Sequence, residues 1–336
     1  KVTLEQVARL AGVSSSTVSR YLSGAHPVAQ ESGAAIESAI RSLNYRPNLV
    51  ARGLATGRTM TVGVLTQEIV STFFNEAMRG VEDGLAGHHY DAVFASGHWQ
   101  PEVELQRFNS LVGRGVEGVI LIHPGIDDAA LERHALTVPM VVVGRRVAAA
   151  RVCSLGLDHH EGAKQAMRHL LELGHRRIAF IGGPSGRGDA DERHRAYADM
   201  LAEAGVPFDA RLVAPGNYVE SGGLAAMNML LDRGLPFTAV FAANDDSAYG
   251  AMLALHRRGL RVPDDVSVVG FDDVSHSAFS LPPLTTVRQP LHELGREAAN
   301  AIVALIGERK PPRGALLRQE LIVRESTRAL PADVPG

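Results

Sequence analysis

The chain has 336 residues, of which 45% are hydrophobic and 21% charged, as is ordinary for a globular protein with more than one domain. Its single cysteine, Cys153, excludes an internal disulfide framework and a cysteine-rich zinc site, and we expect no cofactor. No apolar run reaches the roughly eighteen residues of a membrane span, and the N-terminus lacks a signal-peptide pattern. We therefore expect a cytoplasmic protein without membrane contact.

The net charge of −3 is unevenly distributed along the chain. Residues 1–58 contain seven Lys or Arg and three Asp or Glu, a net charge of +4, whereas the remaining residues carry −7. A basic head on an acidic body indicates that only the head meets a polyanion such as DNA.

The first segment has the spacing of a helix-turn-helix. Thr3 and Gln6 form a capping-box pattern at a helix start. Gly12 ends that helix, because glycine adopts the left-handed conformation without a steric penalty, and Ser14 is a favourable N-cap for the next helix. The pattern predicts three helices, over residues 4–11, 15–23 and 30–43.

The second of these helices presents small hydroxyl groups and a basic side chain on its exposed face. Val18 is predicted to face the core, while the exposed positions are Ser15, Ser16, Ser19 and Arg20. Small side chains let a helix lie deep in the major groove, where Arg20 can bind a guanine edge or a phosphate. The alternative is a small helical cap without a DNA role, which the helix spacing and the local positive charge disfavour.

A short segment, residues 47–58, follows the head. Between Pro47 and Gly57 it has too little apolar surface for a stable isolated helix, because the free-energy cost of nucleation exceeds the stabilisation that about two helical turns provide. We expect it to become helical only when DNA or a second copy of the chain supports it.

From residue 60 onward, short apolar runs alternate with amphipathic helices. The runs span residues 62–66, 92–96, 118–122, 140–143, 178–182, 239–243 and 266–271. Most are apolar throughout, as in parallel strands buried on both faces, and their spacing fits β-α-β units. The glycines of residues 182–186 lack the spacing of a dinucleotide-binding loop, so we interpret this segment as an ordinary loop. The predicted fold class is therefore α/β.

In a parallel sheet, ligands bind beyond the carboxyl ends of the strands. The predicted effector-binding residues there are Gln67, Phe73, Phe74, His98, Arg193, Tyr218, Asn244, Asp272 and Gln289. Two alternatives stay open: Asp272 could cap a turn, and Arg193 could be a solvated ion-pair partner. His123 and His175 are interpreted as packing residues.

Two groups of motifs resemble the LacI/GalR family of bacterial repressors. In the head they are Val2-Thr3-Leu4, Val7-Ala8, Ala11-Gly12-Val13-Ser14, Thr17-Val18-Ser19-Arg20, Leu43-Asn44-Tyr45-Arg46-Pro47-Asn48, Ala51-Arg52, Leu54 and Thr56-Gly57-Arg58. In the body they span residues 174–184, 241–245, 262–273, 282–290 and 324–327. The likeness covers nearly the whole chain.

The resemblance implies a homodimer with a three-helix head, a hinge helix and a two-lobed sensor with the periplasmic-binding-protein fold. The implied boundaries are 1–46 for the head, 47–58 for the hinge and 59–336 for the sensor, with an N-lobe of about 59–157 and 289–318 and a C-lobe of about 158–288 and 319–330. The implied DNA contacts are Thr3, Leu4, Ser14, Ser15, Ser16, Thr17, Ser19, Arg20, Asn48, Ala51, Arg52 and Leu54. Arg193, Asn244 and Asp272 match effector-contact positions, with Phe74 and Tyr218 as apolar walls.

The sequence departs from the family pattern at three places. Ala29 stands where a serine commonly caps the third helix. Serine at positions 15 and 16 specifies bases poorly, because a hydroxyl both donates and accepts. The family's acidic position after the fourth strand is here Gly144-Arg145, so no particular relative's ligand can be transferred.

The predicted function is a transcription regulator, expected to be a repressor, whose affinity for operator DNA is controlled by a sugar or sugar derivative. A purine-responsive or corepressor-responsive regulator is the alternative of the same architecture. A sugar-acting enzyme with a DNA-binding head is disfavoured by the absence of a nucleophile elbow, a P-loop and metal-ligand spacing. A transport-type binding protein is disfavoured by the intact reading head.

The resemblance implies that Leu54 wedges into a central base step of the minor groove and bends the DNA; the alternative is a plain helix–helix contact. Replacing Leu54 by Ala should weaken operator binding and abolish bending in a circular-permutation gel, while effector binding stays unchanged. Unaltered bending would contradict this role of Leu54.

Overall fold

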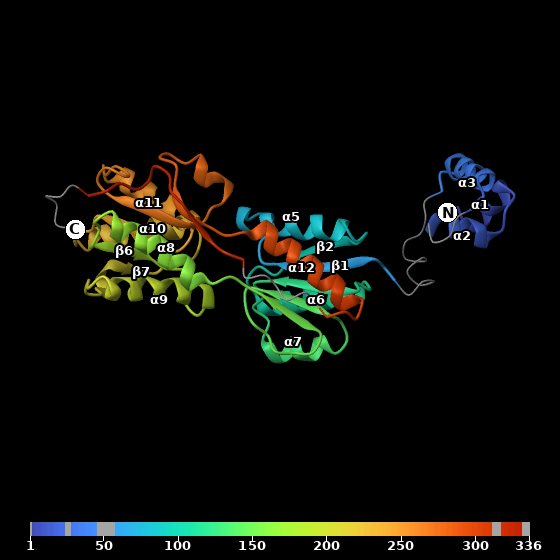
Figure 1. Cartoon of the computed structure of the whole chain (residues 1–336), viewed down its shortest axis with the longest axis horizontal. Coiled ribbons are helices and arrows are strands. Elements are labelled where there is room, and N and C mark those ends of the chain that lie inside the picture. Colours follow the sequence, from blue (N-terminus) through green and yellow to red (C-terminus); the bar gives the residue numbers. More distant parts are fainter. Residues whose placement is uncertain (1, 24–27, 46–57, 311–316, 331–336) are drawn as a thin grey trace. The chain divides into compact units, whose positions relative to one another are not determined.

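The computed structural model describes residues 2–23, 28–45, 58–310 and 317–330. The chain divides into two units, Lys1–Met60 and Thr61–Gly336, which are described separately (Figure 1). The predicted hinge contacts Asn48, Ala51, Arg52 and Leu54 lie outside the described residues. Within the described part of the chain, no helix is long and apolar enough to cross a membrane.

The described residues of the first unit form the three predicted helices, α1 (Leu4–Ala11), α2 (Ser15–Ser23) and α3 (Gln30–Leu43). Thr3 and Gln6 form the predicted capping box, in which the Thr3 amide donates to Gln6 Oε1 over 2.9 Å. Gly12 takes the left-handed conformation at φ 66° and ends α1. The apolar faces of all three helices meet in one small core around Val7, Val18 and Ile36.

The second unit contains two mainly parallel sheets. The first has the strand order β2-β1-β3-β4-β5 and the second β11-β10-β9-β8-β6-β7. The strands are β1 (Thr61–Thr66), β2 (Asp91–Ser96), β3 (Gly118–Ile122), β4 (Met140–Val143), β5 (Val152–Leu155), β6 (Ile178–Ile181), β7 (Val213–Ala214), β8 (Ala239–Ala242), β9 (Ser267–Asp272), β10 (Thr285–Arg288) and β11 (Glu320–Ile322). Only the pair β10–β11 is antiparallel among the described strands. All seven predicted strands form, with ends shifted by at most one residue.

Helices cover both faces of each sheet (Figure 1). We call the first sheet with its helices the N-lobe; these are α5 (Thr72–Ala86), α6 (Pro101–Gly113), α7 (Asp128–Ala135) and α12 (Leu291–Ile306). The second sheet with its helices is the C-lobe; these are α8 (His159–Glu172), α9 (Gly188–Glu203), α10 (Glu220–Asp232) and α11 (Asp245–Arg257), with 3₁₀ turns η1 (Ala210–Leu212) and η2 (Ser275–Ala278). The chain passes between the lobes after β5, after β10 and between α12 and β11.

The cores lie on both faces of the sheets, as the continuous apolar strands require. Residues of β3, β4, β6 and β8 are buried along their whole length. Since helices occupy the faces, the carboxyl ends of the strands are left to the loops, and the two lobes present these loops to each other.

Glycines allow two helix pairs to pack with their backbones in contact. A Cβ at Gly295 of α12 would overlap the carbonyl of Ala77 on α5, and a Cβ at Gly80 would overlap the carbonyl of His292. The pair α10–α11 repeats this arrangement through Gly223. Backbone atoms cannot rotate away as a flexible side chain can, so these positions tolerate no side chain.

Replacing Gly295 by Ala should therefore destabilise the folded chain by about 1–3 kcal/mol, the range typical of overpacking. Gly113, which also lies on a helix but has open space around it, is the matched control, and Gly113→Ala should stabilise by roughly 0.4–1 kcal/mol. Urea denaturation midpoints of the two variants test this difference, and equal midpoints would show that the helices can separate at no cost.

Candidate functional site

The exposed face of α2 carries the side chains predicted to read DNA. Ser15, Ser16, Ser19 and Arg20 are all exposed, while Val18 on the opposite face is fully buried. Of the two contacts predicted on α1, Thr3 is the exposed N-cap, and Leu4 is half-buried against the core of the head.

A hydrogen-bonded hydroxyl cluster stands at the start of α2. Ser14 Oγ lies 2.8 Å from both Ser16 Oγ and Thr17 Oγ1, and it accepts from the Thr17 amide over 3.2 Å. Arg20 folds back along the helix, where Nε donates to the Ser16 carbonyl and Nη2 to Thr17 Oγ1. Base contacts by Ser16 and Arg20 would therefore replace bonds within the helix.

A buried guanidinium organises the C-lobe side of the predicted effector site. Arg193 of α9 is 2% exposed. Its Nη1 donates to the Ala243 carbonyl over 2.6 Å, its Nη2 lies 3.2 Å from His159 Nδ1, and its plane lies 4.0 Å from the centre of the Phe271 ring. Because an arginine always carries its charge, His159 Nδ1 accepts, and burial together with Arg193 lowers the pKa of His159 to about 3. Arg193 is not a solvated ion-pair partner.

Asp189 and Tyr218 complete this cluster. Tyr218 Oη donates to Asp189 Oδ2 over 2.9 Å, and Arg193 Nη2 lies 3.7 Å from the same oxygen. Burial opposes ionisation of Asp189, but the charges of Arg193 and its neighbours outweigh burial, so the pKa of this carboxyl lies well below its ordinary value. Asp189 is therefore an ionised acceptor. Tyr218 has a φ of 65°, and a Cβ at Gly183 would overlap its ring.

Asp272 ends β9 and faces Gln289, whose Nε2 donates to Asp272 Oδ1 over 2.6 Å. No described residue donates a hydrogen bond to Asp272 Oδ2. Burial raises the pKa of Asp272 well above its ordinary value, against the opposing charge of Arg193. The neighbouring Asp273 has a different environment: it pairs with Arg288 over 2.7 Å and with Arg324 over 2.6 Å. Asp273, not Asp272, is the structural carboxylate.

Asn244 and Asp245 join α11 to the loop after β9. Asn244 caps α11 by accepting from the Ser247 amide over 3.1 Å, and its Nδ2 donates to the Tyr218 carbonyl over 3.1 Å. The Asp245 carboxyl accepts from Thr286 Oγ1 over 2.5 Å, from Ser277 Oγ over 2.6 Å and from the Val274 amide over 3.0 Å. Burial raises the pKa of Asp245 to about 7, although these hydrogen bonds oppose the shift.

On the N-lobe side, Gln67 is fully buried and is bonded at both ends to the backbone. Its Nε2 donates to the His123 carbonyl over 2.8 Å, and its Oε1 accepts from the Trp99 amide over 2.9 Å. Gln67 thus positions two loops. His98 lies 3.5 Å from Glu68 Oε1, within its own lobe.

An aromatic cluster lies beside Gln67. Phe74 is nearly buried, with its ring 5.1 Å from that of Phe73, 5.8 Å from Trp99 and 6.1 Å from His123. Burial lowers the pKa of His123 to about 4, so its ring is neutral near pH 7. A Cβ at Gly144 would lie 2.6 Å from His123 Nδ1, so the imidazole fills the space beside position 144.

Arg145 leaves this cluster. Its Nη1 pairs with Asp128 Oδ1 and its Nη2 donates to the Ile126 carbonyl. The space beside position 144 is therefore occupied by the neutral ring of His123, and the side chain of Arg145 is bonded elsewhere.

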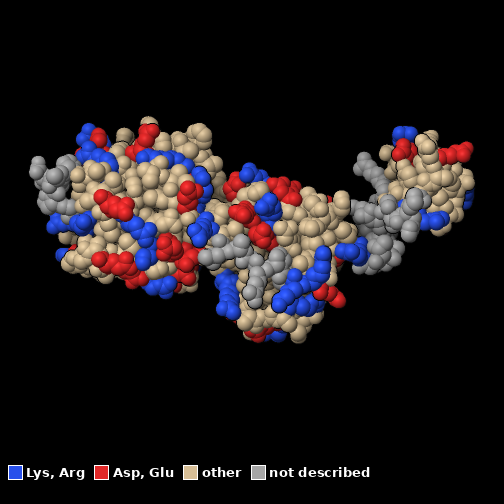
Figure 2. All heavy atoms as spheres, in the orientation of Figure 1, with Lys and Arg blue, Asp and Glu red and all other residues tan. Residues whose placement is uncertain are grey.

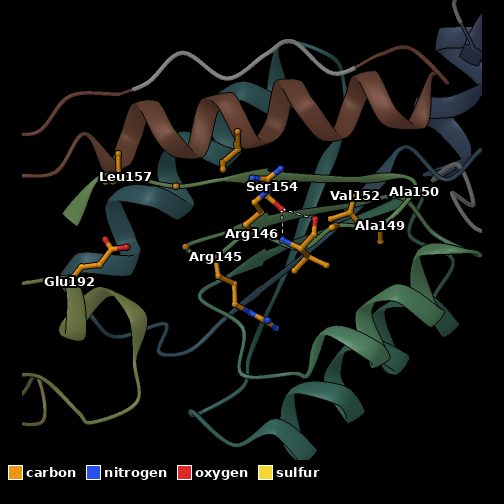
Figure 3. A pocket seen from close by; sticks show the side chains of 13 residues that line it. Arg145, Arg146, Ala149, Ala150, Val152, Ser154, Leu157 and Glu192 are labelled. Atoms are coloured by element: carbon orange, nitrogen blue, oxygen red, sulfur yellow. Dashed lines mark hydrogen bonds between the residues drawn. The ribbon is translucent and has the colours of Figure 1, made fainter. Parts of the chain in front are cut away.

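A cavity of about 730 Å³ lies along the connection from β4 to β5. Figure 3 shows Glu192, on α9, at one end and Ala149, Ala150 and Val152 at the other. Its lining shares no residue with the predicted effector-binding set, although Glu192 precedes Arg193 in the chain. We assign it no ligand.

The structure thus brings Arg193, Tyr218 and Asn244 into direct contact, with the Asp272–Gln289 pair beside them. Sequence reasoning missed three members of the site: Trp99, Asp189 and Arg187, whose guanidinium lies over the Trp99 ring. Each follows the carboxyl end of a strand, the same signal that identified its neighbours His98 and Arg193. Among the described residues, no group of three His, Cys, Asp or Glu is placed to hold a metal ion.

Acidic and basic side chains intermingle over the visible face of both lobes (Figure 2). Strong positive charge therefore does not mark this face of the second unit as a DNA surface, in keeping with the basic head. A helix-turn-helix unit followed by a two-lobed unit with converging polar loops defines a ligand-responsive DNA-binding regulator.

Comparisons with known proteins agree with this class. The model of the bacterial regulatory proteins of the lacI family matches residues 3–48, and that of the periplasmic binding protein-like domain matches residues 167–327. The transcriptional regulator GalR of Salmonella typhimurium is 36% identical over 98% of this chain and 97% of its own. The regulator CelR of Thermobifida fusca is 38% identical over 96% of this chain and 98% of its own.

Two solved structures are similar over nearly the whole chain. A complex of the regulator CelR with cellobiose has a TM-score of 0.73 at 37% identity, covering 97% of this chain and all of that chain. A Lac repressor dimer bound to operator and an anti-inducer has a TM-score of 0.87 at 29% identity, covering 98% of this chain and 99% of that chain. The chain belongs to the LacI/GalR family of bacterial transcriptional regulators.

The raised pKa of Asp245 predicts a pH-dependent stability. The carboxyl titrates near 3.8 in the unfolded chain and near 7 in the folded one, so between these values the folded state holds a proton that the unfolded state releases. Its contribution therefore makes the folded state less stable as pH rises from about 4 to about 7. In Asp245→Asn this decline is absent, and the stability difference from the parent chain changes by at most about 4 kcal/mol across the window.

Urea titrations at about pH 4 and about pH 8 measure this difference. Asp209→Asn is the control, because hydrogen bonds from Arg211 hold the pKa of its exposed carboxyl below the ordinary value and give no such decline. A parallel pH dependence in the parent chain and in Asp245→Asn would show that Asp245 is ionised throughout.

Proposed function

We propose that this protein is a homodimeric transcriptional repressor whose affinity for operator DNA is set by a sugar or sugar derivative bound between the two lobes. It would work in the cytoplasm, where bacterial DNA lies, and it would catalyse no reaction. Family membership supports DNA-dependent regulation, and the CelR–cellobiose complex supports a carbohydrate as the class of effector.

The observation that carries the effector proposal is a group of charged side chains near the strand ends whose hydrogen-bonding capacity the described residues do not fill. Arg193 Nε is buried without a hydrogen-bond partner among them, and Arg187 Nε has only the ion pair with Asp189 Oδ1 at 3.5 Å. Asp272 Oδ2 and the ionised Asp189 offer acceptors beside them. A polyhydroxylated ligand supplies both acceptors and donors, and the rings of Phe74 and Tyr218 suit the apolar face of a sugar.

The homodimer is supported by an exposed apolar loop after η2. Phe279 is 85% exposed and Leu281 is 93% exposed. Large apolar side chains adjacent in a loop are typical of a surface that a partner covers. A symmetric dimer would place two reading helices on one operator, which matches the two-fold symmetry of such sites.

Control of DNA binding follows from linkage. An effector that binds the closed lobes more tightly than the open ones shifts the population toward the closed form. If the closed dimer holds the two heads at a spacing unlike that of the operator, affinity for DNA falls by the same free energy. The opposite preference would make the same ligand a corepressor.

A thermal-shift screen with mono- and disaccharides, sugar acids, nucleosides and purines tests the class of effector. A ligand present at about a hundred times its Kd should stabilise the folded protein by roughly 2.7 kcal/mol, which is readily detected as a raised Tm. A hit among purines alone would replace the sugar by a purine effector, and turnover of a hit would overturn the proposal that the protein is not an enzyme.

Two adjacent carboxyl groups provide a matched pair of variants. Asp272→Asn should abolish the thermal shift given by the screened sugar while leaving operator binding and the unliganded Tm nearly unchanged, because the one hydrogen bond that a described residue makes to its side chain comes from Gln289. Asp273→Asn should lower the Tm, because it weakens the bonds to Arg288 and Arg324, but it should retain the ligand-induced shift. A normal ligand response in Asp272→Asn would refute the assignment of the site.

A further inference from the structure

The loop after β2 is held in an unusual turn. His98 and Trp99 have φ values of 53° and 58°, and the Gln100 amide donates to the Gly97 carbonyl over 3.0 Å. These are the features of a type I′ turn, whose two central positions normally hold Gly, Asn or Asp. A histidine and a tryptophan at these positions are strained, and such strain persists only where the surroundings enforce it.

Gln67 holds this turn in place through two hydrogen bonds. Its Oε1 accepts from the Trp99 amide over 2.9 Å, and its backbone carbonyl accepts from the His98 amide over 3.0 Å. The backbone at Gly97, the first residue of the turn, packs closely against the buried side chain of Glu104, which a Cβ at Gly97 would overlap. The turn therefore has no room to shift toward Glu104. The loop is therefore fixed with the indole of Trp99 at the carboxyl edge of the N-lobe sheet.

The indole meets a cation from the other lobe. The guanidinium of Arg187, in the C-lobe loop between β6 and α9, lies 3.7 Å from the centre of the Trp99 ring. Asp189 Oδ1 lies 3.5 Å from Arg187 Nε and holds the guanidinium over the ring. The indole face is the most favourable aromatic partner for a cation, and partial burial strengthens the attraction.

We propose that the Arg187–Trp99 stack is the latch of the effector site: it holds the lobes closed before any effector arrives and thereby sets the closed population on which effector affinity depends. The inference rests on the proposed function, since the closed lobes are the state that binds effector. Arg187 and Trp99 contribute here as closing residues, and Gln67 is the residue that positions Trp99.

The latch also explains the strain in the turn. An unstrained turn would let the indole adopt other directions. Forming the stack would then cost the conformational entropy of a large side chain. With the ring fixed in advance, most of the attraction to Arg187 is available for closure.

The test uses the full-length protein without effector or operator, so it is independent of whether a sugar is found. Trp99 is the chain's only tryptophan, and quenching of its fluorescence by acrylamide reports its exposure. Spin labels at the exposed positions Ala129→Cys, on α7, and Ala202→Cys, on α9, in a Cys153→Ser background report the distance between lobes by double electron–electron resonance. Labelled chain is mixed with excess unlabelled chain, so that a dimer carries one labelled protomer.

Arg187→Met, which keeps an unbranched apolar stem but removes the charged planar group, should increase quenching and add a population with a longer distance between the labels. The ratio of open to closed protein should rise roughly 2- to 30-fold, as expected from the strength of a cation–π contact. Arg187→Lys, which keeps a cation, should restore part of the closed population. Arg211→Met, which removes an exposed ion pair of the same lobe, is the control and should match the parent chain.

Two results would overturn the latch. Greater quenching with an unchanged distance distribution would mean that Arg187 only covers the indole, and unchanged quenching would mean that the stack does not form. A normal circular dichroism spectrum and Tm for Arg187→Lys keep the test decisive if Arg187→Met folds poorly. Failure here leaves the sugar screen untouched, and failure of the screen leaves the latch measurable.

Discussion

The buried charge of Arg193 is the constraint on which the C-lobe site depends. A guanidinium that cannot lose its proton must be matched by acceptors once it leaves water, or its burial is prohibitive. The chain meets this need with the Ala243 carbonyl at the end of β8, with a neutral His159 and with the ionised Asp189. These partners come from separate strand-end loops and helix starts, so the charge orders the loops around it. Tyr218 is held in its left-handed conformation by the same cluster.

The N-lobe side is organised differently, by a neutral group. Gln67 satisfies the backbone of two loops at once and leaves the aromatic rings to form the wall of the site. The C-lobe therefore contributes the charged groups together with the ring of Tyr218, and the N-lobe contributes mainly apolar surface. This division suits the proposed ligand, which has hydroxyl groups on one side and an apolar face on the other.

The fold was predictable from the sequence where strands buried on both faces appear as continuous apolar runs. The seven continuous runs became strands, whereas β5, β7, β10 and β11 escaped notice because they are two to four residues long and all but β7 are partly polar. The head was predictable because capping boxes and glycine C-caps are local. The contacts between distant residues were not predictable. Nothing in the sequence indicates that the Gln67 side chain bonds to two backbone groups, or that Arg187 stacks on Trp99 across the lobes. The strand-end rule applied to every polar residue, and not only to those that match the family, would have included Asp189.

Asp245 ties the interior of the sensor to its surface. The Asp245 carboxyl accepts hydrogen bonds from Thr286 on β10, from the Val274 amide in the loop after β9, and from Ser277 in η2. Ser277 lies two residues before the exposed ring of Phe279. These three hydrogen bonds link Asp245, next in the chain to Asn244, to the loop that carries Phe279 without involving the bulk of the C-lobe. A shift of the Asp245 carboxyl would therefore act first on η2 and on the exposed loop after it.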